Sequence, residues 1–148
     1  MALIDRITED MAAAMRSRDQ ARLAPLRMAK AALMNREVER GRPLEDAEAQ
    51  QVIVSLIKQR RDSIEQFRAG GRDDLVAKET AEIGVLEAYA PPALDPAEIE
   101  SAVDEAIRET GASSPKDMGR VMKAAMARLA GRGADGKTVN EIVRRRLG

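Results

Sequence analysis

Apolar residues recur along this chain at the three- and four-residue spacing of amphipathic helices, and the pattern breaks at glycines and prolines. The apolar residues are mainly Ala, Leu, Ile, Val and Met, the usual residues of packed helices, and nothing in the pattern suggests a sheet. The spacing predicts helices over residues 2–17, 19–40, 46–69, 73–90, 96–110, 115–129 and 136–147. We therefore expect an all-α protein.

The clearest break in the pattern lies near residues 91–95, where Pro91 and Pro92 end one helix and a new start signal follows. Asp95 is placed to cap the next helix, with Pro96 at its first position and Glu98 at its third, which is a capping-box arrangement. We expect an N-terminal domain of four helices over residues 1–92 and a tail domain of three helices over residues 93–148.

Two smaller features refine this picture. Ser114, Pro115 and Asp117 repeat the cap, proline and acid order of a helix start. Arg60 lies inside the apolar stripe of the helix over 46–69, and we expect a partly buried arginine whose stem packs and whose head meets a carboxylate. The spacing also favours core packing over ligand binding for the methionines at positions 118, 122 and 126.

The composition removes several kinds of chemistry. The chain has no cysteine and no histidine, so disulfides, thiol nucleophiles, histidine metal ligands and a Ser-His-Asp triad are excluded. Phe67 and Tyr89 are the only aromatic residues. No site for a metal or organic cofactor is evident, and acidic pairs such as Asp73 with Asp74 look like helix-start residues.

The chain also lacks the signals that direct a protein to a membrane. No window approaches the roughly 18 apolar residues of a membrane span, and the N-terminal MALIDRITED is acidic where a secretory signal would be basic. These observations predict a cytoplasmic protein without a membrane partner.

Charge is unevenly distributed although the net charge is zero. Residues 1–110 hold 16 basic and 22 acidic side chains, whereas residues 111–148 hold 9 and 3. The two ends of the chain are therefore expected to meet different partners.

The sequence GRGADGKT, residues 131–138, matches the phosphate-loop pattern G-x-x-x-x-G-K-[ST]. A phosphate loop requires a buried strand before it, and the preceding MGRVMKAAMARLA has a helical pattern. Only ten residues follow Thr138, which leaves no room for a later strand with an acidic magnesium ligand. We interpret the match as accidental and the glycines as a tight turn between two helices.

The two helices joined by this turn are rich in cations. Amides and cations that converge near a helix start suit a phosphate of a polymer backbone, whereas the alternative is a basic surface that is only solvated. The candidate RNA-binding residues are Lys116, Arg120, Lys123, Arg128, Arg132, Lys137, Arg144, Arg145 and Arg146.

Three segments resemble one known family. QRRDSIEQFRAGGRDDLVAKETAEIGVLEAYAPPAL (59–94) is similar to the N-terminal half of the YqeY-like proteins, and LRMAKAALMNREVERG (26–41) also fits. DMGRVMKAAMARLAGRGADGKTVNEIVRRRL (117–147) resembles their C-terminal motif, which also occurs at the tail of the aspartyl/glutamyl-tRNA amidotransferase B subunit. The family loop is commonly the shorter G-x-A-D-G, so the placement of Arg132 differs from the family pattern.

The resemblance implies an all-helical protein with a tail domain of the GatB/YqeY type. In the amidotransferase that tail binds tRNA through its shape and backbone, while the chemistry belongs to other parts of the enzyme. The family label is therefore a carbon-nitrogen ligase with glutamine as amido-N-donor. This chain lacks the glycine- and serine-rich amidase segment and any cysteine that could replace its serine nucleophile.

Three hypotheses follow. The first is a non-catalytic accessory protein that binds tRNA or other structured RNA, with amidotransferase or aminoacyl-tRNA synthetase components as candidate partners and no DNA. The absence of aromatics from the tail favours structured RNA over single strands. The second is a protein-protein adaptor whose acidic N-terminal helices dock an enzyme or subunit. The third is an enzyme, either a nucleotidase or an amide-forming ligase.

Overall fold

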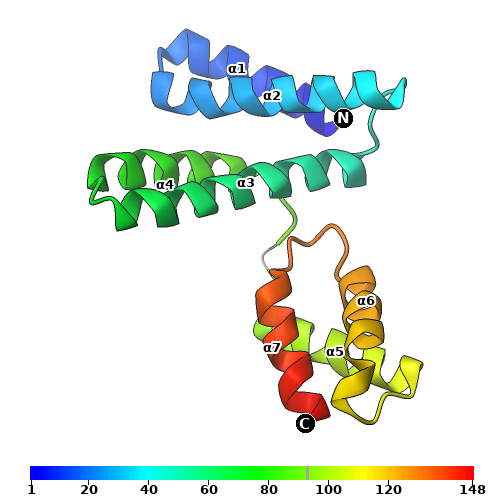
Figure 1. The fold of residues 1–148 in the computed structure, drawn as a ribbon. Coiled ribbons are helices and arrows are strands. Elements are labelled where there is room, and N and C mark those ends of the chain that lie inside the picture. The colour runs from blue at the N-terminus through cyan, green and yellow to red at the C-terminus, as the bar shows by residue number, and fades with distance from the viewer. Residues whose placement is uncertain (93) are drawn as a thin grey trace. The chain divides into compact units, whose positions relative to one another are not determined.

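The computed structural model describes residues 1–92 and 94–148, and it confirms the all-α class: the described residues form helices, turns and loops without a strand. Helix starts and ends follow the breaks in the apolar pattern (Figure 1). The elements are α1 (Leu3–Ser17), α2 (Gln20–Arg40), α3 (Asp46–Ala69), α4 (Asp73–Glu87), α5 (Pro96–Thr110), the 3-10 turn η1 (Pro115–Asp117), α6 (Met118–Arg128) and α7 (Gly136–Leu147).

The chain divides into two compact units, Met1–Pro91 (unit 1) and Pro92–Gly148 (unit 2). Unit 1 holds α1 to α4, and unit 2 holds η1 and α5 to α7. Whether each unit folds alone as a domain stays a prediction.

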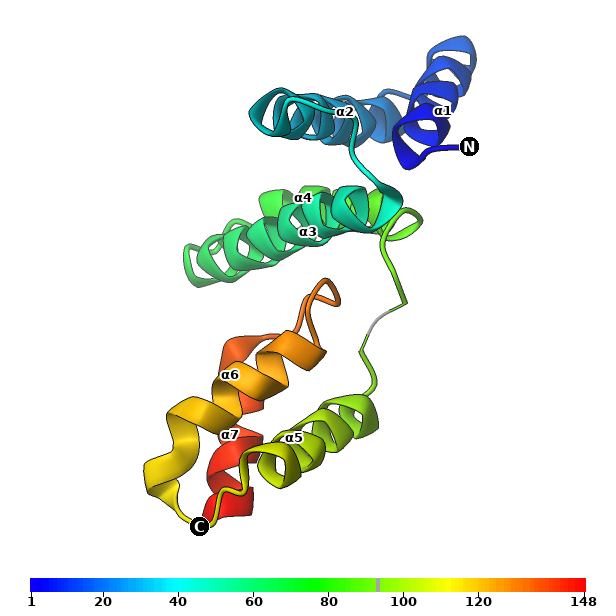
Figure 2. The same cartoon turned by 90° about the vertical axis from the view of Figure 1, so that its right-hand side faces the viewer.

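Unit 1 consists of two antiparallel helix pairs, α1 with α2 and α3 with α4, stacked as two layers (Figures 1 and 2). The apolar faces of both pairs meet in one core, in which Leu26, Leu33, Ile53 and Leu86 are fully buried. At about 25 cal/mol per Å² of apolar area, this burial is the main favourable term for the unit.

Two polar side chains are buried in unit 1. Arg60 is 6% exposed, and its Nε and Nη2 lie 3.0 Å from a carboxylate oxygen of Glu82 on α4. Glu79 follows at 3.8 Å, so the predicted contact of the arginine head with a carboxylate is confirmed, and the side chain is more deeply buried than expected. Tyr89 is 2% exposed and donates its hydroxyl to the carboxylate of Asp10 on α1. The first contact joins the neighbouring helices α3 and α4, and the second joins α1 to the turn after α4.

In unit 2, helices α5, α6 and α7 each pack against the other two around a core made mainly of valine, isoleucine and alanine (Figure 2). Val103, Val121, Val139 and Val143 are fully buried there. The methionines at positions 118, 122 and 126 pack against this core, as the spacing predicted.

Side-chain caps begin α2, α3, α5 and α7, whereas Ala2 before α1 and Arg72 before α4 make no capping bond. The Asp95 side chain accepts a hydrogen bond from the amide of Ala97, and the capping box with Glu98 is formed. The expectation for Ser114 was wrong: its side chain makes no capping bond, and Pro115–Asp117 forms a 3-10 turn before α6 begins. The carboxylate of Asp117 instead accepts from the amide of Ser113 at 3.1 Å.

The division into units changes the distribution of charge expected from the sequence. Unit 1 carries 16 acidic and 15 basic residues, so it is not an acidic bundle. The acidic excess of residues 1–110 comes mainly from α5, which holds five acids and one arginine and belongs to unit 2. Unit 2 therefore combines an acidic helix with a basic pair.

Candidate nucleic-acid interface

All nine candidate cations lie in unit 2. They are distributed over the 3-10 turn, both helices of the α6–α7 pair and the loop between them. Lys116 lies on η1, Arg120, Lys123 and Arg128 on α6, Arg132 in the loop, and Lys137, Arg144, Arg145 and Arg146 on α7.

The face of α7 that points away from the core carries three of these cations. Because Val139, Ile142 and Val143 are buried, residues on the opposite side of the helix must face solvent. Lys137, Arg144 and Arg145 occupy that side at helical spacing and are exposed. Arg144 and Arg145 line an open surface hollow together with Glu141, which is the one acid of this helix.

The loop before α7 is a turn between two helices, as interpreted from the sequence. Gly131 and Gly133 have φ angles of 79° and 71°, a backbone region that favours glycine. The helix α6 leads into this loop, and the described part of the chain contains no strand that could build a phosphate loop. The carboxylate of Asp135 accepts from the Lys137 amide at 3.1 Å, so an acid already occupies the start of α7.

Arg120 forms an ion pair with an acid that lies close to it in the sequence. Its Nη2 lies 2.5 Å from a carboxylate oxygen of Asp117, three residues earlier in the chain. The hydrogen bond from Arg120, followed by that from the Ser113 amide, holds the pKa of the Asp117 carboxyl below its usual range. The guanidinium remains exposed to solvent.

Two further arginines reach across to α5. Arg128 lies 2.6 Å from Glu105 and 2.9 Å from Glu109, and Arg146 lies 3.0 Å from Asp104. These pairs join the ends of α6 and α7 to the acidic helix. They neutralise part of the positive charge on the basic pair, because each guanidinium is within contact distance of a carboxylate.

Arg132 fastens the α6–α7 loop to the first residues of unit 2. One of its terminal nitrogens donates to the backbone carbonyl of Pro92 at 3.1 Å, and the other lies 3.1 Å from Glu98 on α5. Its Nε is buried without a hydrogen-bond partner. Arg132 therefore helps to hold the α6–α7 loop against α5 and the segment before it.

The structure thus separates the nine cations into two sets. Arg120, Arg128, Arg132 and Arg146 form ion pairs inside unit 2. Within residues 1–92 and 94–148, no carboxylate lies within 4.0 Å of the charged nitrogens of the other five. This second set, which we call the unpaired cations, is Lys116, Lys123, Lys137, Arg144 and Arg145.

The acids that pair with these arginines were not foreseen. Asp104, Glu105 and Glu109 lie more than fifteen residues before their partners, so no local pattern connects them. The available signal was the density of acids in residues 96–110. Since a helix that packs against a basic pair brings its acids close to it, that density could have indicated the ion pairs.

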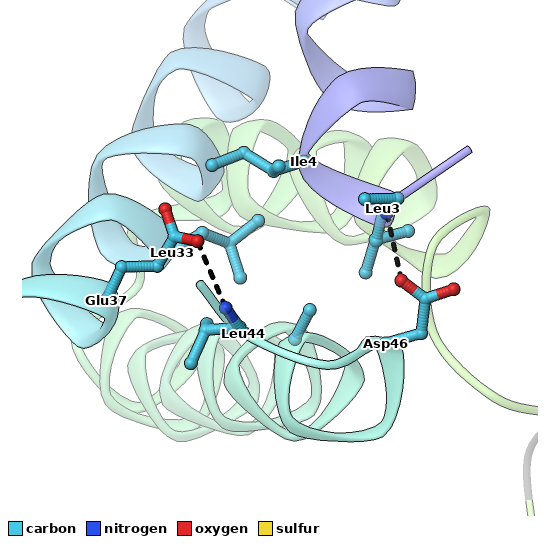
Figure 3. A pocket seen from close by; sticks show the side chains of 8 residues that line it. Leu3, Ile4, Leu33, Glu37, Leu44 and Asp46 are labelled. Atoms are coloured by element: carbon cyan, nitrogen blue, oxygen red, sulfur yellow. Dashed lines mark hydrogen bonds between the residues drawn. The ribbon is translucent and has the colours of Figure 1, made fainter. Parts of the chain in front are cut away.

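Neither the charge pattern nor the cavities indicate an organic-ligand or metal site. The described residues contain no cluster of three acidic side chains placed to hold a metal ion. A small cavity between α1, α2 and α3 has a volume of about 10 Å³, which is room for roughly one water molecule (Figure 3). It is bordered by hydrogen bonds from the Leu3 amide to Asp46 and from the Leu44 amide to Glu37.

Comparisons with known proteins find one family model that matches nearly the whole chain and several relatives that share one name. The family described as Yqey-like protein matches residues 4–147. A protein of Pyrenophora tritici-repentis named "Altered inheritance of mitochondria protein 41, mitochondrial" is 30% identical over 99% of this chain and 81% of its own length. Proteins of the same name from Eremothecium gossypii and Saccharomyces cerevisiae are 32% and 33% identical, over 70% and 60% of this chain and 58% and 48% of their own lengths.

The expectation of a cytoplasmic protein is contradicted by these relatives, which are named as mitochondrial proteins. The features behind that expectation were the lack of an apolar membrane span and of a secretory signal, and neither distinguishes the cytoplasm from the interior of an organelle. In the part of the chain that the structure describes, none of the helices combines the length and the apolar character that crossing a bilayer requires.

Proposed function

Since this chain belongs to the YqeY-like family, we propose that it is a non-catalytic accessory protein that binds tRNA or another structured RNA through unit 2. The protein acts beside glutamine-dependent tRNA amidation, and a component of an amidotransferase or an aminoacyl-tRNA synthetase is its partner. The observation that carries the proposal is the set of five exposed, unpaired cations on η1, α6 and α7.

The arrangement of charge in unit 2 supports a polyanionic ligand. Acids concentrate on α5 and cations on the α6–α7 pair, so the unit presents sides of opposite sign. Such a distribution orients an approaching polyanion toward the basic side and raises its association rate. Structured RNA is recognised mainly through phosphates, 2′-hydroxyls and shape, and lysine and arginine are sufficient for these contacts.

The ion-paired arginines can also contact the RNA once they leave their carboxylate partners. Exposed ion pairs contribute only about 0 to 1 kcal/mol, so a phosphate can replace a carboxylate partner at small cost. Arg128 and Arg146 are therefore weaker contributors than the unpaired cations. If binding depended only on net charge, substituting an ion-paired arginine would weaken it as much as substituting an unpaired cation. This proposal instead predicts a larger loss of affinity for the unpaired cations.

The test is the binding of the full chain to unmodified tRNA, measured by fluorescence anisotropy at several salt concentrations. We expect the double substitution Arg144→Gln with Arg145→Gln to weaken binding by about tenfold or more, because each removes a phosphate contact. The slope of log affinity against log salt should fall by about one to two units.

The matched comparison is between the single substitutions Arg145→Gln and Arg146→Gln, each of which removes one positive charge from α7, although only the second breaks an ion pair with Asp104. We expect Arg145→Gln to weaken binding by about threefold or more and Arg146→Gln by less than about twofold, since the Arg146 guanidinium is already partly neutralised. Equal losses from single substitutions at positions 145 and 146, or an affinity that does not change with salt, would contradict the proposal.

A further inference from the structure

The side of α2 that faces away from the core of unit 1 is unusually apolar for an exposed surface. Ala24, Arg27, Ala31, Met34 and Val38 follow one another at spacings of three and four residues and are all exposed. We call these five residues the α2 outer stripe. Val38 is 80% exposed and Met34 is 50% exposed, although both are large apolar residues.

The spacing within the stripe is that of a helix with a second helix along its side. Ala24 and Ala31 allow another backbone to approach the N-terminal part of the stripe, and Met34 and Val38 provide apolar contact area in its C-terminal part. The inner side of α2 already has its partners, because Leu26, Ala29 and Leu33 are buried in the core of unit 1. The outer stripe has the pattern of a helix interface without an observed partner among the described residues.

The charged residues near the N-terminal end of the stripe are almost all basic. Arg16 and Arg18 lie at the turn into α2, Arg27 lies in the stripe and Lys30 lies beside it. None of these four cations is in an ion pair within the described residues. From residue 11 to residue 34 the only acid is Asp19, whose carboxylate accepts from the Arg22 amide as the helix cap.

We propose that the α2 outer stripe binds an acidic amphipathic helix of another protein. The partner's apolar side covers Met34 and Val38, and its carboxylates meet Arg27 and the cations at the start of α2. This inference does not depend on RNA binding, since it concerns unit 1 and a different set of residues.

Other occupants fit the stripe less well. A second copy of this chain packed antiparallel would present the C-terminal part of its own α2, where Arg36 and Arg40 offset Glu37 and Glu39, so it supplies no net acid to meet these cations. RNA offers phosphates for the arginines but nothing that covers Met34 and Val38. A membrane-bound helix of this kind usually carries leucine or aromatic residues on its apolar side, and the stripe has neither.

A designed peptide tests the chemistry of the surface with the full chain. The probe is a labelled synthetic helix with leucines at heptad spacing and glutamates elsewhere, and its counterpart has lysine in place of each glutamate. We expect the glutamate peptide to bind at least about tenfold more tightly than the lysine peptide, because of charge complementarity. Equal binding of both peptides, or binding of neither, overturns the proposal.

Variants locate the binding to the stripe. Arg27→Glu and Val38→Gln should each weaken binding of the glutamate peptide by about fivefold or more. The matched control is Lys58→Glu, another charge reversal at an exposed helix position, here on α3 and outside the stripe. Unchanged helical circular dichroism excludes unfolding, and an equal loss in the control overturns the assignment to the stripe.

Photocrosslinking identifies the natural occupant. The full chain carries p-benzoylphenylalanine in place of Val38 in cells that express it, and the attached peptide is sequenced by mass spectrometry. We expect a peptide with apolar residues at helical spacing and an excess of acids, and a loss of the adduct when Arg27→Glu is added. An adduct with this chain itself, with RNA or with lipid, or no adduct, overturns the proposal.

Discussion

Unit 1 contains a buried ion-paired arginine, whereas the described ion-paired arginines of unit 2 all lie at the surface. In unit 1, Arg60 is buried at 6% exposure between α3 and α4 and faces two glutamates. In unit 2, every arginine of a described ion pair keeps 32% or more of its side chain exposed. A charge inside a core must keep its partner, whereas a charge on the surface can exchange its partner for a ligand. Arg60 is therefore fixed in its pair, whereas the surface arginines of unit 2 can exchange a carboxylate for an anionic ligand.

The largest loss of stability is expected when the buried pair of Arg60 and Glu82 is broken. Arg60→Ala leaves Glu82, and in part Glu79, without a partner in a poorly solvated position, and should lower the free energy of unfolding by about 4 kcal/mol. Urea denaturation followed by circular dichroism measures this loss. The double variant Arg60→Met with Glu82→Leu should recover most of it, and no recovery would mean that packing around position 60 dominates.

A core substitution in unit 2 tests whether the two units unfold separately. Ile142 is buried in unit 2, and Ile142→Ala should cost about 3 kcal/mol through lost burial and a cavity. If the units are independent, this variant shifts one unfolding transition and Arg60→Ala shifts the other. A single transition that moves as a whole in both variants would show that the units unfold together.

The next effect concerns Tyr89, the only tyrosine in the chain. Tyr89→Phe keeps the ring that packs under Arg6 but removes the hydrogen bond to Asp10, and should cost about 1.5 kcal/mol at neutral pH. Urea denaturation at pH 7 gives the value. An unchanged stability would mean that the Asp10 carboxylate is fully satisfied by water.

The same residue predicts a change of stability with pH. Burial, with the Asp10 hydrogen bond next, raises the pKa of Tyr89 from 10.0 to about 12. The unfolded chain loses this proton first, so the tyrosine's contribution to the free energy of unfolding is constant below about pH 10 and falls between pH 10 and pH 12. The ultraviolet absorbance of the tyrosinate follows the titration directly, and a midpoint near 10 in the folded protein would contradict it.

The smallest effect is expected at the surface pairs of unit 2. Arg128→Gln removes contacts with Glu105 and Glu109, but both acids remain solvated, so the loss should be about 0.5 kcal/mol or less. Thermal unfolding at two salt concentrations measures it. A loss as large as that from Arg60→Ala would remove the distinction between the two units.

Local signals were sufficient for most of the fold. Breaks in the apolar pattern predicted α3 at 46–69 and α7 at 136–147, because glycines and capping acids determine where a helix can begin and end. The 3-10 turn at residues 115–117 was missed. Ser114 has the right residue type for a cap, but its side chain makes no capping bond, and the carboxylate of Asp117 accepts from the Ser113 amide.

The candidate interface was less predictable than the fold. The nine cations could be selected from composition and spacing, yet the sequence could not separate Arg145 from Arg146. One faces solvent and the other meets Asp104, and that difference depends on how α7 packs against α5. The outer stripe of α2 was also missed, because its residues read as part of an ordinary amphipathic helix until the buried side was known.

The bond from Arg132 to the carbonyl of Pro92 has a practical consequence for dissecting the molecule. The acceptor belongs to the first residue of unit 2, so a fragment that begins later would leave this guanidinium without one of its two anchors. An isolated tail prepared for spectroscopy or crystallisation should therefore start at or before Pro92, even though the first helix of that tail begins only at Pro96.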